Sequence, residues 1–445
     1  MKTKLVGLAL ATVIVIGGTY VARAATGGSA SGAASSVIGL ADAPNDAPGG
    51  SDLPDVERLI RDFEQDVRQH PNSTGLSFLG GLYLQRARLT GDVDTFEQAR
   101  TALAAALRMA PTDEETLGRE ATLRFTTHDF PGALTVANGV LASDPKAYGL
   151  MAVRGDALVE LGRYDDAGAT YDALARAVPD TSAVDVRRSH LAFLEGRDAD
   201  AWRLAVAAEH EAVQAGVFGA ALAYYRTAPA QLALDSGRYA VAERYARAAL
   251  SAAPDYYAAI AMLGKVRAAQ GHIDEAIRLY ERAVAIVPQP DYLAALGDLY
   301  TLRGEHAKAD VEYGTVQVIG TLAQINRQVY NRLVAVFDAD HDRNHVDAVT
   351  LTARELTVRK DVYGWDAYAW ALLKAGRVGE ARAASDHALA LGTRDPKLLY
   401  HAGMIAKAQG DRPRARDLLH RALSISPNFD PFQVPIAHRA LRAVE

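Results

Sequence analysis

One residue pattern recurs along most of this chain at a spacing of about 34 residues, and it constrains the fold more than any other feature. Its clearest copy runs from Gly155 to Pro179, and related copies begin at Leu263, Leu296 and Gly403. Small residues at fixed positions let two helices approach to about 8–10 Å, and a proline is tolerated just past the second helix. The pattern therefore predicts consecutive helix–turn–helix units, each of which buries its apolar face against its neighbours.

The period and the residue types resemble the tetratricopeptide repeat family. The residues that carry this resemblance in the clearest copy are Gly155, Leu158, Gly162, Tyr164, Ala167, Tyr171 and Pro179. The resemblance implies an all-α fold, a right-handed superhelical α-solenoid of about ten tetratricopeptide-type repeats with a capping helix at each end. The last third of the chain, with the stretch Tyr363–Ala371 and the turn Leu391-Gly392-Thr393, also looks like exported bacterial members of this family. Such an array offers a binding surface for a protein or peptide rather than a reaction pocket.

Five segments are expected along the chain. They are an export signal or N-terminal membrane anchor (1–24), a flexible linker rich in Ala, Gly, Ser and Pro (25–53), an N-terminal capping helix (54–73), the repeat array (74–429) and a C-terminal capping helix (430–445). The linker composition buries too little apolar area to offset the entropy of ordering its chain.

The first segment has the parts of an export signal. Lys2 and Lys4 precede an uncharged stretch from Leu5 to Ala22, and Ala22-Arg23-Ala24 resembles a cleavage site. The stretch is also just long enough to span a bilayer, so cleavage and retention as an anchor both remain open. In either case the positive end stays inside and the repeats are expected outside the cytoplasm, whether secreted, in the cell envelope or anchored.

Composition argues against several classes of function. The 54 acidic residues outnumber the 48 basic ones, which disfavours electrostatic binding of nucleic acid. The chain has no cysteine, so disulfides, thiol catalysis and cysteine-ligated metals are excluded. The phosphate-binding loop, the nucleophile elbow and the zinc-protease motif do not occur. We expect no enzyme activity, no cofactor and no metal site.

One acidic stretch has part of the pattern of a metal site. The alternating residues from Asp338 to Asn344 resemble the start of a calcium loop. However, Arg343 occupies the position that needs glycine, and Val349 occupies the position that needs glutamate. We interpret the stretch as a polar turn, and a metal-dependent enzyme is the less favoured alternative.

In the resembled family, the first helix of each repeat lines the inner, concave wall of the solenoid. Carrying these positions over to this chain yields nine partner-binding candidates: Arg187, Tyr224, Lys265, Tyr363, Trp370, Lys397, Tyr400, His401 and Lys407. The C-terminal candidates mix aromatic and basic side chains, which anchor interfaces well. The predicted partner is a protein or peptide of unknown identity, and membrane contact is expected only through the N-terminal segment. The alternative is a self-associating structural protein that forms a homodimer.

Overall fold

The computed structural model describes residues 53–92, 94–179, 181–325 and 332–445. The predicted export signal and the linker up to residue 52 lie outside these residues. Throughout the described ranges the chain forms α-helices and no strand, which confirms the predicted all-α repeat fold. None of the described helices is both long and apolar enough to cross a membrane.

Within the described residues, ten consecutive helix pairs follow a first helix, α2 (Leu53–Gln69), and precede a last one, α23 (Val434–Arg442). The pairs are α3 (Ser73–Thr90) with α4 (Asp94–Met109), α5 (Glu114–Thr126) with α6 (Phe130–Ser143), α7 (Tyr148–Glu160) with α8 (Tyr164–Ala177), α9 (Ser182–Leu194) with α10 (Asp198–Gln214), α11 (Gly219–Asp235) with α12 (Tyr239–Ala252), α13 (Tyr257–Ala269) with α14 (Ile273–Ile286), α15 (Pro290–Leu302) with α16 (His306–Ile325), α17 (Arg332–Asp340) with α18 (His345–Glu355), α19 (Val362–Lys374) with α20 (Val378–Leu389), and α21 (Pro396–Ala408) with α22 (Arg412–Ile425). We number these pairs as repeats one to ten.

Glycines of the repeat pattern have two separate structural roles. Within the pairs, a side chain on Gly155 or Gly297 would overlap the ring of Tyr171 or Tyr313, so the small residue lets the two helices approach. Between the helices of a pair, Gly304 has a φ of 75°, a left-handed conformation that other residues adopt only at a cost. The same two requirements recur in successive repeats and produce the sequence period.

The apolar core is shared between neighbouring repeats. One cluster extends from Ala230 on α11 to Phe337 on α17 and includes the buried Leu263, Tyr280 and Leu296. Because each repeat is covered by its neighbours, the first and last repeats need the additional helices α2 and α23. Val56 of α2 and Ala437 of α23 are buried against these ends.

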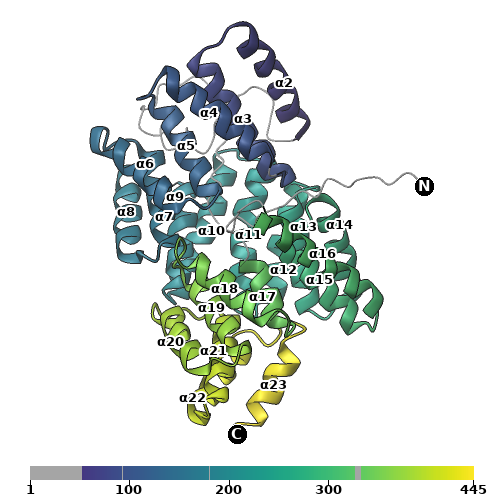
Figure 1. Cartoon of the computed structure of the whole chain (residues 1–445). Helices are drawn as coiled ribbons and strands as arrows, with labels where there is room; N and C mark the ends of the chain where they lie inside the picture. The colour runs from purple at the N-terminus through teal and green to yellow at the C-terminus, as the bar shows by residue number, and fades with distance from the viewer. Residues whose placement is uncertain (1–52, 93, 180, 326–331) are drawn as a thin grey trace, which may run out of the picture.

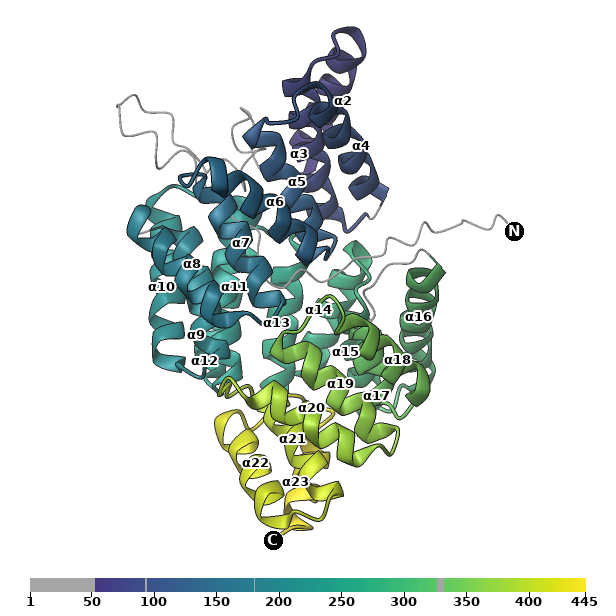
Figure 2. The same cartoon turned by 60° about the vertical axis from the view of Figure 1, so that its left-hand side comes forward.

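The superhelix also turns back on itself. In Figures 1 and 2 the C-terminal helices, green to yellow, lie beside the teal segment that contains α9 to α12. The backbone amide of Lys360 donates a hydrogen bond to the carbonyl oxygen of Glu160 at 2.8 Å, across 200 positions of sequence. The amide of Asn428 likewise donates to the hydroxyl oxygen of Tyr239 at 2.7 Å. The C-terminal repeats therefore pack directly on the middle of the array.

Candidate functional site: the inner wall

Polar side chains on the first helices of neighbouring repeats pair with one another, about one repeat apart in sequence. We call these paired groups, together with the other polar and aromatic side chains on the first helices and at their ends, the inner wall. On α7 and α9, Arg187 Nε donates to Asp156 Oδ1 at 2.9 Å. Between α19 and α21, a ring nitrogen of His401 lies 2.8 Å from Asp366 Oδ2. The inner wall is therefore largely a set of internal partners, since buried polar groups need such partners.

Four of the nine predicted partner-binding residues are buried in this arrangement. Trp370, Tyr400 and His401 are each 1% exposed, and Arg187 is 4% exposed. Trp370 stacks on His401 with ring centroids 4.2 Å apart, and the hydroxyl of Tyr400 donates to Gln433 Oε1 at 2.9 Å. In this conformation each of the four side chains is enclosed by its own neighbours, so none of them is presented to a partner.

Asp340 is the common acceptor in the C-terminal part of the wall. Trp370 Nε1 donates to one of its oxygens at 2.8 Å, and Lys397 Nζ donates to the other at 3.1 Å. Burial acts to raise the pKa of Asp340, but Lys397, His401 and His341 together outweigh it, and the pKa lies below its usual value. The positive charge of Lys397, which the prediction assigned to a partner, is therefore paired with the carboxylate of Asp340.

The other five predicted residues keep accessible surface. Lys265 on α13 is exposed, and its Nζ donates to Gln231 Oε1 at 3.2 Å. Tyr224, Tyr363 and Lys397 are partly exposed, and Lys407 near the end of α21 is exposed. The hydroxyl of Tyr363 points to Asp395 Oδ2 at 3.5 Å. These five side chains are the ones that a partner can reach in this conformation.

Aspartates at the inner wall form a feature that sequence reasoning largely missed. Burial raises the pKa of Asp235 to about 7, Lys265 opposes the shift, and Asp395 adds to it. Burial also raises the pKa of Asp291 to about 6. Asp395 has a raised pKa as well, again chiefly because of burial. The prediction described a basic and aromatic cluster, but partly exposed carboxyl groups also lie on this wall.

The stretch considered as a metal loop is used for internal contacts. Asp338 Oδ1 accepts from Gln317 Nε2 at 2.6 Å, and His341 lies 2.7 Å from Asp298 Oδ1. Asp340 faces Trp370 and Lys397 instead. Within the described residues, no group of three potential metal ligands converges on one point.

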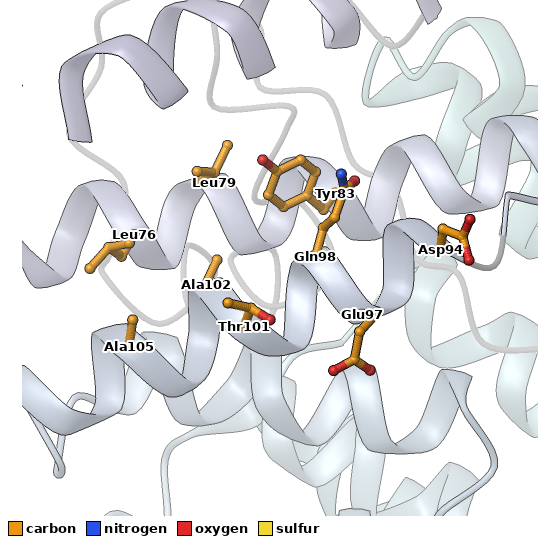
Figure 3. A pocket seen from close by; sticks show the side chains of 9 residues that line it. All are labelled: Leu76, Leu79, Tyr83, Asp94, Glu97, Gln98, Thr101, Ala102 and Ala105. Carbon is orange, nitrogen blue, oxygen red and sulfur yellow. The ribbon is translucent and has the colours of Figure 1, made fainter. Parts of the chain in front are cut away.

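An apolar groove of about 560 Å³ lies at the N-terminal end of the array (Figure 3). Its walls come from α3 and α4, with Leu76 and Tyr83 on one side and Glu97, Thr101 and Ala105 on the other. None of the nine predicted residues lines it. The groove is therefore a surface separate from the inner wall.

Comparisons with known proteins agree with the repeat pattern. Two models described as tetratricopeptide repeat match residues 119–181 and 233–299. Among solved structures, the crystal structure of the APC/C hetero-tetramer Cut9–Hcn1 is similar at 13% identity, covering 88% of this chain and 93% of that chain, with a TM-score of 0.33. PilW, a widely conserved type IV pilus biogenesis factor, is similar at 20% identity, covering 46% of this chain and 92% of that chain, with a TM-score of 0.39. No curated protein matches the sequence.

Proposed function

Because this chain is a tetratricopeptide repeat protein, we propose that it is a non-enzymatic scaffold that binds a protein or peptide outside the cytoplasm. Protein interaction is the general function of such repeats, and they are typically non-catalytic. The location outside the cytoplasm rests on the positive, apolar and small-residue order of residues 1–24.

The proposed binding surface is the accessible part of the inner wall. Its residues are Tyr224, Lys265, Tyr363, Lys397 and Lys407. The observation that carries this proposal is that aromatic and charged groups remain accessible beside Asp235 and Asp395, on a wall where buried groups such as Arg187 are paired internally. Aromatic and charged side chains together supply the anchors and the orientation of an interface.

Affinity capture with the full-length chain, tagged at its C-terminus, tests the proposal. The binding variant is Lys265→Ala together with Tyr363→Ala, and the control is Lys308→Ala, which removes an exposed lysine from the second helix α16. We expect a protein that is captured by the parent and the control but about tenfold less by the binding variant, a loss typical of removing anchor residues. Equal capture by all three forms would move the interface away from this wall.

Localisation is tested separately by cell fractionation and by the N-terminal sequence of the purified protein. A mature protein that begins at Ala25 would identify residues 1–24 as a cleaved signal. A full-length membrane-bound form would identify an anchor. Full-length protein in the cytoplasm would contradict the proposed location.

Self-association is the second candidate, and one exposed apolar face favours it. Val311 and Val318 lie seven positions apart on α16 and are 64% and 49% exposed. Residues seven apart share one face of a helix, and exposed apolar patches often mark interfaces. Light scattering of the parent and of Val311→Lys tests this candidate. A dimer that the substitution converts to monomer would support it, and a monomeric parent would remove it.

A further inference from the structure

Three turns in the first half of the array meet three loops in the second half with the same offset of five repeats. The turns contain Gly162, Gly196 and Gly237, which connect the two helices of repeats three, four and five. The loops follow the second helices of repeats eight, nine and ten, at 356–361, 390–395 and 426–433. We call this line of contact the seam.

Each turn glycine lies directly against backbone of the opposite loop or, for Gly237, of the last residue of α22. A side chain on Gly196 would overlap the carbonyl oxygen of Gly392. A Cβ on Gly162 would lie 2.6 Å from the carbonyl oxygen of Lys360, and one on Gly237 would lie 2.7 Å from that of Ile425. These separations are shorter than van der Waals contact, so glycine is required at the seam by close approach as well as by its positive φ.

Hydrogen bonds across the seam involve backbone groups of the loops. The amide of Lys360 donates to the carbonyl oxygen of Glu160, and the amide of Val362 donates to the hydroxyl oxygen of Tyr164 at 2.9 Å. The hydroxyl oxygen of Tyr239 accepts a hydrogen bond from the amide of Asn428 at 2.7 Å and lies 3.1 Å from Ser426 Oγ. Three amides, those of Lys360, Val362 and Asn428, thus depend on the seam for their partners.

A buried ion cluster lies at the repeat-eight end of the seam. Arg359 pairs with Glu160 across the seam, and Arg332 Nη1 lies 3.1 Å from Asp361 Oδ1 on the same side. Glu355 is a third buried carboxylate, 3.8 Å from Arg359. The cluster therefore holds three carboxylates and two arginines, so its ionised form carries an acid excess.

Two carboxyl groups lie on the inner side of the seam, that of Asp235 at the end of α11 and that of Asp395 just before α21. The hydroxyl of Tyr363 lies 3.5 Å from Asp395 Oδ2. Burial chiefly raises the pKa of Asp235 and that of Asp395, and Lys265 opposes both shifts. Tyr363, one of the proposed binding residues, thus lies beside the seam and is partly covered when the seam is closed.

We propose that the seam is a latch: it opens without global unfolding, and the inner wall beside Tyr363 accepts a partner segment in the open form. The second half of this statement rests on the proposed function. Opening breaks contacts between distant loops but leaves every helix pair covered by its sequence neighbours, because a repeat array is held together by nearest-neighbour packing. The apolar contacts that opening loses include those of Val362, Leu398 and Leu391 with the cluster around Leu158.

Native-state hydrogen exchange tests the latch without a partner. The readout is the exchange rate of the three seam amides, Lys360, Val362 and Asn428, compared with amides inside α13 and α14. A latch predicts that the three amides exchange together and about tenfold or more faster than global unfolding allows. Exchange of these amides at the global unfolding rate would overturn the proposal, because the seam would then open only when the whole array unfolds.

Two matched pairs of variants assign that exchange to the seam. Gly196→Ala places a methyl group against Gly392, whereas Gly304→Ala has a similar positive φ but nothing within 4 Å. Tyr239→Phe removes the two hydroxyl contacts across the seam, whereas Tyr300→Phe removes a hydroxyl bond to Glu281 between neighbouring repeats. We expect faster exchange of the seam amides in Gly196→Ala and Tyr239→Phe only. The tyrosine pair keeps the test informative if Gly196→Ala does not fold. Equal exchange in Tyr239→Phe and Tyr300→Phe would contradict the latch.

A covalent cross-link across the seam tests whether opening is needed for binding. The chain has no cysteine, so Asp198→Cys with Arg394→Cys places the only two thiols on either side of the seam. Half of the sample is cross-linked with a short bismaleimide, and half is capped with N-ethylmaleimide. We expect the cross-linked form to capture at least about tenfold less of the protein found with the parent. Equal capture by both forms would overturn the role of opening in access. If neither form nor the parent captures a protein, the proposed function fails, and the exchange rates still decide the latch.

Discussion

The turns at Gly162, Gly196 and Gly237 and those at Gly271, Gly304, Gly376 and Gly410 have the same residue and the same left-handed backbone, yet different surroundings. The first three abut backbone of a distant repeat. The other four have nothing within 4 Å of the position a side chain would take. Local sequence sets the turn in both groups, whereas the path of the superhelix decides which turns become tertiary contacts. The comparison separates what one repeat needs from what the closed array needs.

This difference changes the expected energetics of the molecule. In a simple solenoid, stability is a sum of repeat and nearest-neighbour terms. Here repeats three to five are also joined to repeats eight to ten, so a substitution at the seam affects two distant parts of the chain. Substitutions at the open turns should remain local.

Removal of an arginine should give the largest difference in the free energy of unfolding between the seam and the open turns. Arg359→Ala leaves the buried carboxylate of Glu160 without its ion-pair partner and should lower the free energy of unfolding by about 3–5 kcal/mol. Arg377→Ala, at an open turn, removes an exposed pair with Glu380 and should leave the free energy of unfolding nearly unchanged. Urea unfolding measures both. Similar losses in the two variants would erase the distinction between seam and open turns.

The glycine pair should give the next largest difference. Gly196→Ala combines left-handed strain with overlap at Gly392, and we expect a loss of about 2–4 kcal/mol. Gly304→Ala has strain alone and should lose about 1–2 kcal/mol. Thermal and urea unfolding of the two proteins, side by side, check this order. A loss at Gly304 as large as that at Gly196 would show that the turn conformation, not the seam, sets the cost.

A pH series sharpens the comparison at the inner side of the seam. The pKa of Asp235 is raised to about 7 by burial and by Asp395, against Lys265. Its protonated form therefore stabilises the fold below its ordinary pKa, and this contribution is lost as the pH rises through about 7. Relative to Asp235→Asn, the parent should lose about 1–2 kcal/mol between pH 5 and pH 8. A difference between parent and variant that does not change with pH would contradict this assignment.

The smallest effect is expected at the exposed rim of the seam. Arg394 Nη1 lies 3.4 Å from Asp198 Oδ2, and both side chains are at least 40% exposed. Arg394→Ala should lower stability by less than about 1 kcal/mol, and the difference should disappear in 1 M salt. A larger or salt-independent loss would mean that Arg394 contributes through packing rather than charge.

The repeat pattern was sufficient to predict the all-α solenoid. Each close copy places its small residues where two helices meet, as Gly155 and Tyr171 do, so local spacing carries the information about the helix pair. The stretch that forms α17 and α18 departs from the repeat pattern but still makes a helix pair, because apolar residues such as Phe337 and Ala348 keep helical spacing. Pro229 lies inside the first helix of repeat five, yet α11 continues through it to Asp235.

The candidate site was predicted less well, for two physical reasons. Position within the repeat placed Arg187 and His401 on first helices, but their burial depends on Asp156 and Asp366 about one repeat away. A search for complementary groups at that spacing would have found these pairs. The seam has no such signal, because it results from small rotations that add up over five repeats.

The closed superhelix is the central claim, and a distance across the seam in solution tests it most directly. Spin labels on cysteines that replace Asp198 and Arg394 can be attached specifically, because the parent chain has no cysteine. Pulsed electron paramagnetic resonance then measures the separation of the two loops. The account predicts one dominant short distance, as expected for residues that form an ion pair. A broad distribution centred at long distance would show that the array is open and that the seam is not a feature of the protein in solution.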